Sequence, residues 1–319
     1  MNHYPIKLNA ISKQIIWGGN RLREEYNKQS DGENIAESWE LTVRDDGMNT
    51  ISGSEFDGMT MGEYVKENPS SVTNLPYDRF PLLIKFIDAE ADLSIQVHPD
   101  DAYGLSHKND LGKTEMWYIL DAKPGAKLVY GLKPGCTAET LRVALENGTV
   151  EEQLNYVEVK KGDVYFIPHG LVHAIGAGIL LAEIQQNSNI TYRVYDYNRR
   201  QKDGSLRELH VEDALNVILT RTEEEINAIR YAKASADDKS LLAACEYFTV
   251  YRYDVKQNSA VNLCAGEESF HSVLCLDGNG SLLHNDTEYP LIKGDSYFIP
   301  AGAGDYRILG NTSVIVSKI

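Results

Sequence analysis

A nine-residue segment occurs twice in this chain, and this repeat constrains the fold more than any other feature. Residues 162–170 read Gly-Asp-Val-Tyr-Phe-Ile-Pro-His-Gly, and residues 294–302 read Gly-Asp-Ser-Tyr-Phe-Ile-Pro-Ala-Gly. Three residues after the last glycine of the first copy stands His173, and the equivalent position of the second copy holds Asp305. The chain therefore reads as two copies of one structural unit, of which only the first keeps the histidines.

The residues around both copies are typical of short β-strands separated by tight turns. In each copy a Gly-Asp turn precedes an apolar and aromatic segment, 164–167 or 296–299, that ends at a proline. Segments rich in β-branched and aromatic residues predict further strands at 125–131, 155–160 and 247–253. Such turns between short strands favour a barrel or sandwich that occurs twice. The predicted fold class is mostly β, with two jelly-roll β-barrels.

A few short helices are expected between the strands. Thr137 is a suitable N-cap for a helix over 137–145, and Gly148 would end it. Residues 211–219 carry apolar side chains at helical spacing. The polar stretch 222–239 opens with a capping-box pattern and then loses its periodicity.

The domain boundary is expected in a polar connector. Residues 234–238 read Ala-Ser-Ala-Asp-Asp, which is typical of a linker rather than of a core element. We therefore predict a catalytic domain over 1–236 and a second domain over 237–319 that lacks metal ligands.

The overall composition limits the classes of partner. The 319 residues carry a formal net charge of −16, which argues against nucleic acid as the main partner, because phosphate backbones require clustered Lys and Arg. A small phosphorylated ligand needs only a few local cations and stays compatible. No apolar run is long enough to span a membrane, and no signal peptide is recognised at the N-terminus. A cytoplasmic protein is expected, and two barrels within one chain favour a monomer.

The four cysteines show no Cys-x-x-Cys spacing. Sparse cysteines in an intracellular protein are typically reduced and structural. We expect Cys264 and Cys275 in the core.

Three segments of the first unit contain residues that could bind a metal. Gln96 and His98 are two residues apart in a predicted strand and would share one face. Glu115 lies in a second strand-like segment, and His173 follows the first copy of the repeat. Imidazole nitrogens with carboxylate and amide oxygens suit Zn²⁺, with Mn²⁺, Fe²⁺ or Co²⁺ as alternatives. Taken singly, each of these residues is more often a hydrogen-bonded structural residue than a ligand.

The spacing around His173 favours a metal site. The second motif of the cupin superfamily is matched by the spacing Gly162-x5-Pro168-x-Gly170-x2-His173. The two predicted barrels are therefore expected to be cupin-like. The first cupin motif is altered, because Gln-x-His stands where His-x-His is common.

With this altered motif, the chain resembles one branch of the superfamily, the type I mannose-6-phosphate isomerases in their compact bacterial form. The resemblance is specific over about residues 5–200 and looser towards the C-terminus. It rests on the following segments: Ile16-Trp-Gly-Gly19, Glu37-Ser-Trp-Glu40, Phe80-Pro-Leu-Leu-Ile-Lys-Phe86, Gln96-Val-His-Pro-Asp-Asp101, Lys113-Thr-Glu-Met-Trp-Tyr118, Pro168-His-Gly-Leu-Val-His-Ala-Ile-Gly176 and Glu183-Ile-Gln-Gln-Asn-Ser-Asn-Ile-Thr-Tyr-Arg-Val-Tyr-Asp-Tyr197.

The resemblance implies a function and a set of site residues. The implied reaction is a zinc-dependent aldose–ketose isomerisation between mannose 6-phosphate and fructose 6-phosphate through an enediolate. The implied ligands of one Zn²⁺ per chain are Gln96, His98, Glu115 and His173. Arg193 and Lys113 correspond to active-site residues, and Arg193 is otherwise readable as a surface salt bridge.

The sequence contains no glycine-rich phosphate-binding loop of the kind found in nucleotide-binding proteins. Ser94, Lys113 and Arg193 are therefore the expected substrate contacts. The residue that transfers the proton is not identified, and Lys113, a metal-bound water and a nearby carboxylate stay open.

Two other functions stay open at this point. One is a different metal-dependent cupin enzyme, such as a dioxygenase or another sugar isomerase. The other is a cupin that binds sugar without turnover. One scaffold hosts many chemistries, so the site has to discriminate among these functions.

Overall fold

The computed structural model describes residues 3–201, 203–231 and 240–319. These residues fold into two compact units. Unit 1 contains the described residues of 1–13, 21–86 and 233–319, and unit 2 those of 14–20 and 87–232. The connector predicted at 234–238 lies outside the described residues. The division of the chain after residue 236 stays a prediction.

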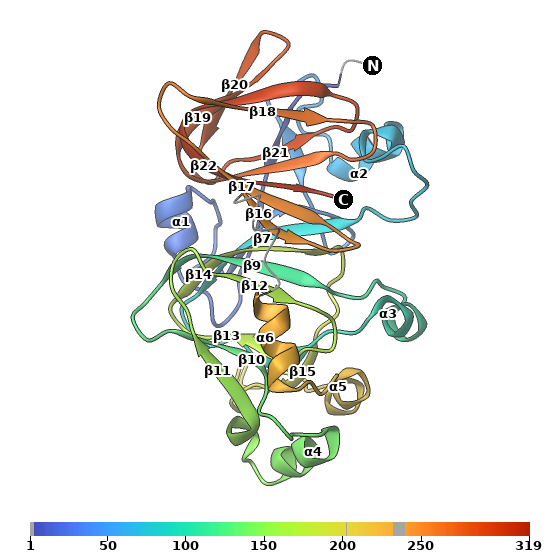
Figure 1. The fold of residues 1–319 in the computed structure, drawn as a ribbon, viewed down its shortest axis with the longest axis vertical. Helices are drawn as coiled ribbons and strands as arrows, with labels where there is room; N and C mark the ends of the chain where they lie inside the picture. Colours follow the sequence, from blue (N-terminus) through green and yellow to red (C-terminus); the bar gives the residue numbers. More distant parts are fainter. Residues whose placement is uncertain (1–2, 202, 232–239) are drawn as a thin grey trace. The chain divides into compact units, whose positions relative to one another are not determined.

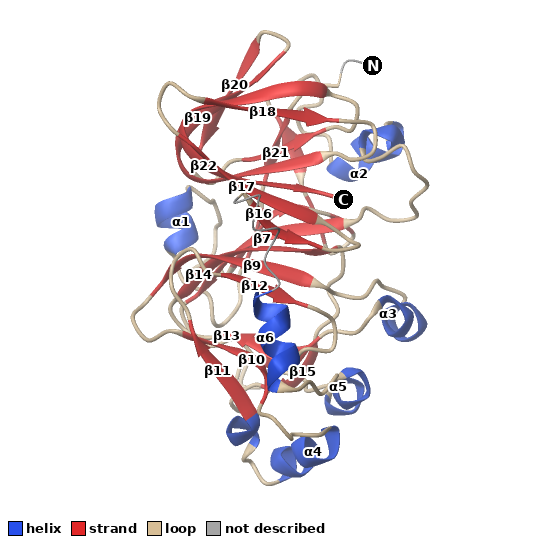
Figure 2. Ribbon diagram, viewed as in Figure 1, coloured by secondary structure: helices blue, strands red, loops and turns tan. Residues whose placement is uncertain are grey.

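The predicted fold class is confirmed, because strands dominate both units and the helices between them are short (Figure 2). The helical elements in chain order are α1 (Arg21–Tyr26), α2 (Met61–Glu67), η1 (Pro69–Ser71), α3 (Asp101–Lys108), α4 (Ala138–Glu146), η2 (Val150–Gln153), α5 (Val211–Val217) and α6 (Glu223–Tyr231). Within the described ranges, none of these helices has the length and apolar character needed to cross a membrane.

Unit 1 is built around a nine-stranded sheet with the order β16-β17-β22-β19-β21-β1-β6, in which β18 pairs with β22 and β20 with β19 (Figure 1). Three further strands pair in the order β7-β3-β2, and β4 pairs with β5. Strand β7 continues from unit 1 into unit 2. The strands are β1 (Ile6–Asn9), β2 (Ile11–Lys13), β3 (Glu37–Leu41), β4 (Val43–Arg44), β5 (Gly47–Met48), β6 (Thr50–Ser52), β7 (Leu82–Ala89), β16 (Leu241–Ala244), β17 (Thr249–Val255), β18 (Ala260–Ala265), β19 (His271–His284), β20 (Thr287–Ile292), β21 (Ser296–Ile299) and β22 (Gly304–Lys318).

Unit 2 contains a five-stranded sheet with the order β11-β10-β13-β8-β15 and a second group of strands with the order β12-β9-β14. The strands are β8 (Ile95–Val97), β9 (Glu115–Ala122), β10 (Lys127–Leu132), β11 (Leu154–Glu158), β12 (Val164–Ile167), β13 (His173–Ile175), β14 (Ile179–Gln186) and β15 (Tyr192–Tyr195). All pairings recorded within these two sets are antiparallel. The pairings place residues that are distant in sequence opposite one another, such as Gln96 and His173.

The elements predicted from local sequence are present. The two strands that follow the Gly-Asp turns are β12 and β21, with the expected bounds. Strands β10, β11 and β17 and helices α4 and α5 agree with prediction to within about two residues at each end. Thr137 caps α4 by accepting the N–H of Thr140 at 3.1 Å. Thr222 caps α6 in the same way through the N–H of Glu225 at 3.2 Å.

The repeated segment forms the same turn in both units. Gly162 and Gly294 both adopt φ +90°, a left-handed conformation that glycine accepts without strain. In residues 160–163 the aspartate carboxylate accepts the N–H three residues earlier at 3.0 Å, and in residues 292–295 the same bond measures 3.1 Å. The sequence repeat is therefore also a repeat of local structure.

A hydrophobic cluster in unit 2 fixes the five-stranded sheet that carries the candidate site. Strand residues such as Ile95, Val97 and Ala174 pack in it with Leu141 of α4 and Leu215 of α5. Figure 1 shows both helices beside this sheet. Because side chains alternate along a strand, Val97 and Ala174 face this cluster while their neighbours Gln96 and His173 face away from it.

The cysteines correct one expectation. All four are free thiols, as predicted, and Cys275 is buried. Cys264, however, is exposed, so its predicted core position is wrong. Alternate residues of β18 face solvent, and Cys264 lies on that exposed face one residue before the buried Ala265.

Candidate metal and substrate site

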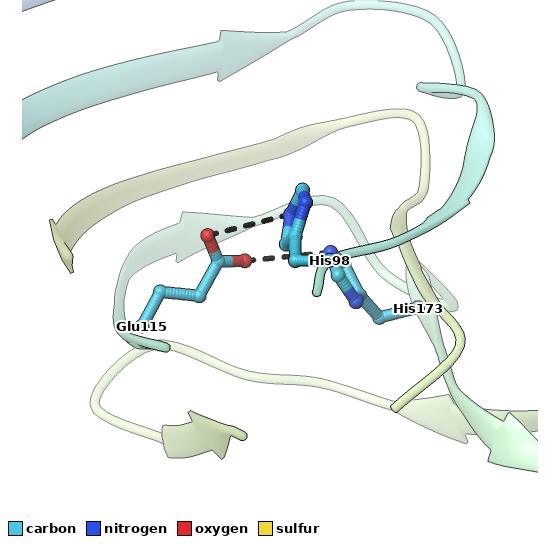
Figure 3. Close-up of side chains that lie close together, drawn as sticks. All are labelled: His98, Glu115 and His173. Carbon is cyan, nitrogen blue, oxygen red and sulfur yellow. Dashed lines mark ion pairs between the residues drawn. The ribbon is translucent and has the colours of Figure 1, made fainter. Parts of the chain in front are cut away.

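Three side chains that are distant in sequence meet in unit 2 (Figure 3). His98 follows β8, Glu115 begins β9 and His173 begins β13. The two oxygens of the Glu115 carboxylate lie 3.4 Å from Nε2 of His173 and 3.7 Å from Nε2 of His98. All three side chains are almost fully buried. In the described part of the chain, this is the one group of three His, Cys, Asp or Glu side chains with donor atoms within 4.8 Å of one another.

Both imidazoles are held in a defined orientation by backbone carbonyls. Nδ1–H of His98 donates to the carbonyl of Ile190, and Nδ1–H of His173 donates to the carbonyl of Leu171, each at 2.8 Å. The remaining nitrogen, Nε2, then carries a lone pair directed towards Glu115. Burial lowers the pKa of His173 to about 4, so this imidazole is neutral at pH 7. A neutral imidazole with its other N–H bonded to a carbonyl is the form that binds metals.

Lys113 places a cation against the same atoms. Its ammonium lies 2.7 Å from Oε2 of Glu115 and 3.1 Å from Nε2 of His98. Only 4% of the residue's surface is exposed, and lysine is rarely buried to this extent without a partner. Lys113 therefore belongs to the cluster that sequence reasoning assembled.

Gln96 and Ser94 connect this cluster to Arg193. Gln96 lies opposite His173 in the pairing of β8 with β13, and its amide Nε2 is 3.4 Å from Nε2 of His173. The Ser94 hydroxyl donates to Oε1 of Gln96 at 3.4 Å and accepts from Nε of Arg193 at 3.3 Å. A continuous series of polar contacts thus runs from Arg193 to Glu115.

Arg193 is half-buried and donates to neutral oxygens. Besides the Ser94 hydroxyl, its guanidinium donates through Nη1 to the carbonyl of Glu208 at 2.6 Å. Burial, followed by the nearby charge of Arg207, lowers the pKa of Arg193, although a guanidinium stays charged at neutral pH. The geometry does not match the alternative of a surface salt bridge, because both contacts are to uncharged oxygens.

Gln186, which sequence reasoning did not select, fixes the segment between Lys113 and Glu115. Its Oε1 accepts the N–H of Thr114 at 2.8 Å, and its own N–H donates to the Thr114 carbonyl at 3.1 Å. Its Nε2 donates to the carboxylate of Asp101 at 3.0 Å. The backbone that carries both functional side chains is thereby held on each side of Thr114.

The residues selected from the sequence lie together, whereas the residues that fix them were missed. Gln186 acts through contacts to the backbone of Thr114, 72 residues earlier, and does not lie in a motif with a recognisable spacing. A weak signal existed for Gln186, because it sits in the quoted segment that starts at Glu183. Glu183 itself accepts the indole N–H of Trp117 at 2.9 Å, and the Trp117 ring packs edge-to-face with the His173 ring at 5.5 Å between centroids.

The donor atoms fit a metal ion. Four-coordinate Zn²⁺ with N and O ligands at about 2.1 Å places its donor atoms roughly 3.4 Å apart. The separations from the Glu115 oxygens to the two imidazole Nε2 atoms are 3.4 and 3.7 Å. The set of two imidazoles and one carboxylate contains no thiolate, which also suits an ion with an open coordination position.

The second copy has different chemistry at the equivalent strand position. His271 begins β19 and lies opposite Ile299, as Glu115 lies opposite Ile167. Nδ1 of His271 is 2.9 Å from the hydroxyl of Tyr306, and burial lowers the pKa of His271 to about 4. In this unit a neutral histidine bonded to Tyr306 stands where unit 2 has the Glu115 carboxylate, and Asp305 occupies the position equivalent to His173.

Comparison with known protein families gives an independent assignment. The model of the phosphomannose isomerase type I catalytic domain matches residues 6–124. The model of the mannose-6-phosphate isomerase cupin domain matches residues 237–319. The two matches lie on both sides of the site residues His173 and Arg193.

Relatives of similar length cover the whole chain. The chain is 34% identical over 320 residues to mannose-6-phosphate isomerase ManA of Bacillus subtilis, with all of both chains covered. It is 33% identical to the mannose-6-phosphate isomerase of Streptococcus mutans, with 98% of each chain covered. A crystal structure of mannose 6-phosphate isomerase from Bacillus subtilis superposes with a TM-score of 0.90 at 36% identity, covering 99% of each chain. The chain is therefore an isomerase that belongs to the type I phosphomannose isomerase family.

Proposed function

We propose that this protein interconverts mannose 6-phosphate and fructose 6-phosphate as a zinc-dependent aldose–ketose isomerase. The observation that carries the proposal is the convergence of His98, Glu115 and His173 with Lys113 in one buried cluster of a member of this family. Arg193 joins the cluster through Ser94. A module that only binds sugar would not need this combination of donors and cations.

The reaction moves a proton between two neighbouring carbon atoms. In the open-chain sugar, the hydrogen on C2 is weakly acidic because it is next to the C1 carbonyl. Its removal gives an enediolate with the charge on O1; the hydroxyl proton then moves from O2 to O1, and reprotonation at C1 gives the ketose with its carbonyl at C2. The negative charge develops on oxygen, so preorganised positive groups that face this oxygen lower the barrier.

The proposed ligands of the metal are His98, Glu115 and His173, with Gln96 as a fourth. When bound, Zn²⁺ supplies Lewis acidity towards the sugar oxygens. The chain contributes two imidazoles whose Nδ1–H groups are bonded to backbone carbonyls, which leaves Nε2 of each ring available to the metal. Gln96 would have to present its amide oxygen, whereas its nitrogen faces His173 at 3.4 Å, so ligation requires a rotation of the amide group.

Arg193 and Lys113 are the proposed residues for charge stabilisation and substrate contact. The guanidinium of Arg193 is permanently charged and is oriented by Ser94 and Glu208. The ammonium of Lys113 lies among the donor atoms of the cluster and could contact a sugar oxygen or the phosphate. Ser94 is a proposed substrate contact beside Arg193. No residue is assigned as the base that removes the C2 proton.

The reaction is tested by a coupled assay of fructose 6-phosphate formation with zinc-loaded protein. We expect conversion of mannose 6-phosphate and much weaker conversion of unphosphorylated mannose, since the proposed contacts include the phosphate. In deuterium oxide, the product should acquire solvent deuterium at C1, because an enediolate exchanges its transferred proton with solvent to some extent. Absence of conversion would contradict the proposal. Oxygen consumption, or sugar binding without turnover, would favour one of the other cupin functions.

A further inference from the structure

His210 occupies an unusual position for its residue type. It is the residue immediately before α5, where Ser, Thr, Asp or Asn would stabilise the helix through a side-chain cap. The side chain of His210 makes no capping bond, and its ring is directed to Arg193 instead. Residues that forgo a local stabilising interaction are often found at functional sites.

His210 is bonded to the backbone of Arg193 in both directions. The N–H of Arg193 donates to Nδ1 of His210 at 3.2 Å, and the N–H of His210 donates to the Arg193 carbonyl at 2.7 Å. The guanidinium of Arg193 donates to the carbonyl of Glu208, two residues earlier in the same segment. Residues 208–210 therefore hold Arg193 at its N–H, its carbonyl and the end of its side chain.

The opposite edge of β15 explains why such support is needed. Arg193 lies opposite Gln96 of β8, and the register of this pairing shifts between Arg193 and Tyr195. A bulge of this kind interrupts the regular ladder and redirects the neighbouring side chains. Strand β15 is the last strand of its sheet, so one of its edges faces away from β8. On that edge, His210 makes the two bonds to Arg193 that a neighbouring strand would otherwise provide.

We propose that His210 is a positioning residue that fixes the Arg193 backbone, and through it the guanidinium, in the geometry needed for isomerisation. The proposal rests on the function proposed above, because it gives Arg193 its role. His210 acts through Arg193 and needs no contact with the substrate. Its expected effect is on turnover more than on substrate affinity.

The hydrogen bond from Arg193 also gives the site a sensitivity to pH. Nδ1 can accept the Arg193 N–H only while it is unprotonated. Burial, followed by the charge of Arg193, lowers the pKa of His210, so the acceptor form prevails at pH 7 and is lost as the pH falls through this lowered value. The charged groups that face His210 are Arg193 on β15, Glu208 in the preceding segment, Lys108 on α3 and Asp213 on α5.

Two variants of the zinc-loaded enzyme separate positioning from general structure. His210→Ala removes the acceptor and should lower kcat about tenfold while KM changes little. His210→Asn keeps an acceptor at the place of Nδ1 but cannot be protonated, so it should retain most of the wild-type kcat and lose one step from the acidic side of the pH profile. His107→Asn, at an exposed histidine of α3, is the matched control and should behave as wild type.

The outcomes distinguish this proposal from the proposed function. Wild-type kcat and an unchanged pH profile in His210→Ala would overturn the positioning role. An acidic limb that persists unchanged in His210→Asn would overturn the pH sensitivity. If the wild-type protein itself has no isomerase activity, the proposed function fails. The hydrogen bond from the Arg193 N–H to His210 is then tested by the amide NMR resonance of Arg193. That resonance should shift with pH in wild type, as His210 titrates, and should not shift in His210→Asn. A resonance that does not shift with pH in wild type would overturn the proposed bond between Arg193 and His210.

Discussion

His173→Ala is expected to lose both its bound zinc and its isomerase activity. The imidazole is buried, neutral at pH 7 and oriented by the Leu171 carbonyl, with Nε2 3.4 Å from Glu115, so its truncation removes a donor atom from the proposed metal site. Loss of a group that merely orients a ligand weakens metal binding about 10–100-fold, and loss of the ligand itself should exceed that range. Zinc content after gel filtration and turnover of mannose 6-phosphate measure the two effects.

The control for this variant has to separate metal loss from unfolding. His107→Ala removes an exposed imidazole from the same unit and should keep full zinc content and activity. Circular dichroism of His173→Ala should show the strand content of wild type, because one truncated side chain leaves the ladders of unit 2 in place. A folded His173→Ala protein with one tightly bound zinc would remove His173 from the ligand set.

Arg193→Ala is expected to lower kcat while the zinc content stays at the wild-type value. Removing one preorganised donor to a developing oxyanion typically costs about 10²–10³-fold in kcat. Among the described contacts, Arg193 is connected to the metal cluster through Ser94 and Gln96 and bonds none of the three proposed ligands, so its loss should leave His98, Glu115 and His173 able to bind the ion. Steady-state kinetics together with metal analysis of the same preparation measure both quantities.

Two further substitutions define what Arg193 contributes. Arg193→Lys keeps the charge but loses the planar fork that contacts Ser94 and Glu208, so its turnover should lie between those of wild type and Arg193→Ala. Arg200→Ala, at an exposed arginine of the same segment, should retain normal kinetics. Wild-type turnover in Arg193→Ala would end its catalytic role.

Features that depend on neighbouring residues could be predicted from the sequence. The helix after Thr137 begins where the cap predicts, because the Thr137 hydroxyl needs only the N–H of Thr140. The turn at Gly162 recurs at Gly294, because glycine and the following aspartate are sufficient to form it. Cys264 was misplaced because its exposure depends on which face of β18 packs inward.

The candidate ligands and cations could be selected from their spacing and from the family resemblance. The hydrogen bonds that orient these side chains could not be predicted in this way. The bond from His98 to Ile190 joins residues 92 positions apart, and the bonds of Gln186 to Thr114 depend on the pairing of distant strands. His210 holds Arg193 on the edge of β15 that faces away from β8, which no local pattern indicates. A side chain that bonds to backbone atoms cannot be recognised from a single sequence, because many residue types can donate to a carbonyl or accept a backbone N–H.

The orientation of Gln96 illustrates the same limit at the level of single atoms. Spacing places Gln96 and His98 near one another, and the structure brings the Gln96 amide to 3.4 Å from His173. Which end of the amide faces the cluster depends on the Ser94 hydroxyl, which donates to Oε1. The sequence identifies the residue type, whereas the hydrogen-bond partners decide whether the oxygen can bind a metal.

The central claim is that isomerisation requires a metal held by His98, Glu115 and His173. The most direct test follows mannose 6-phosphate conversion in one preparation before chelation, after removal of the chelated metal, and after addition of one equivalent of Zn²⁺ per chain. Our account predicts that activity disappears with the metal and returns with zinc. Undiminished conversion by protein shown to be free of metal would contradict it.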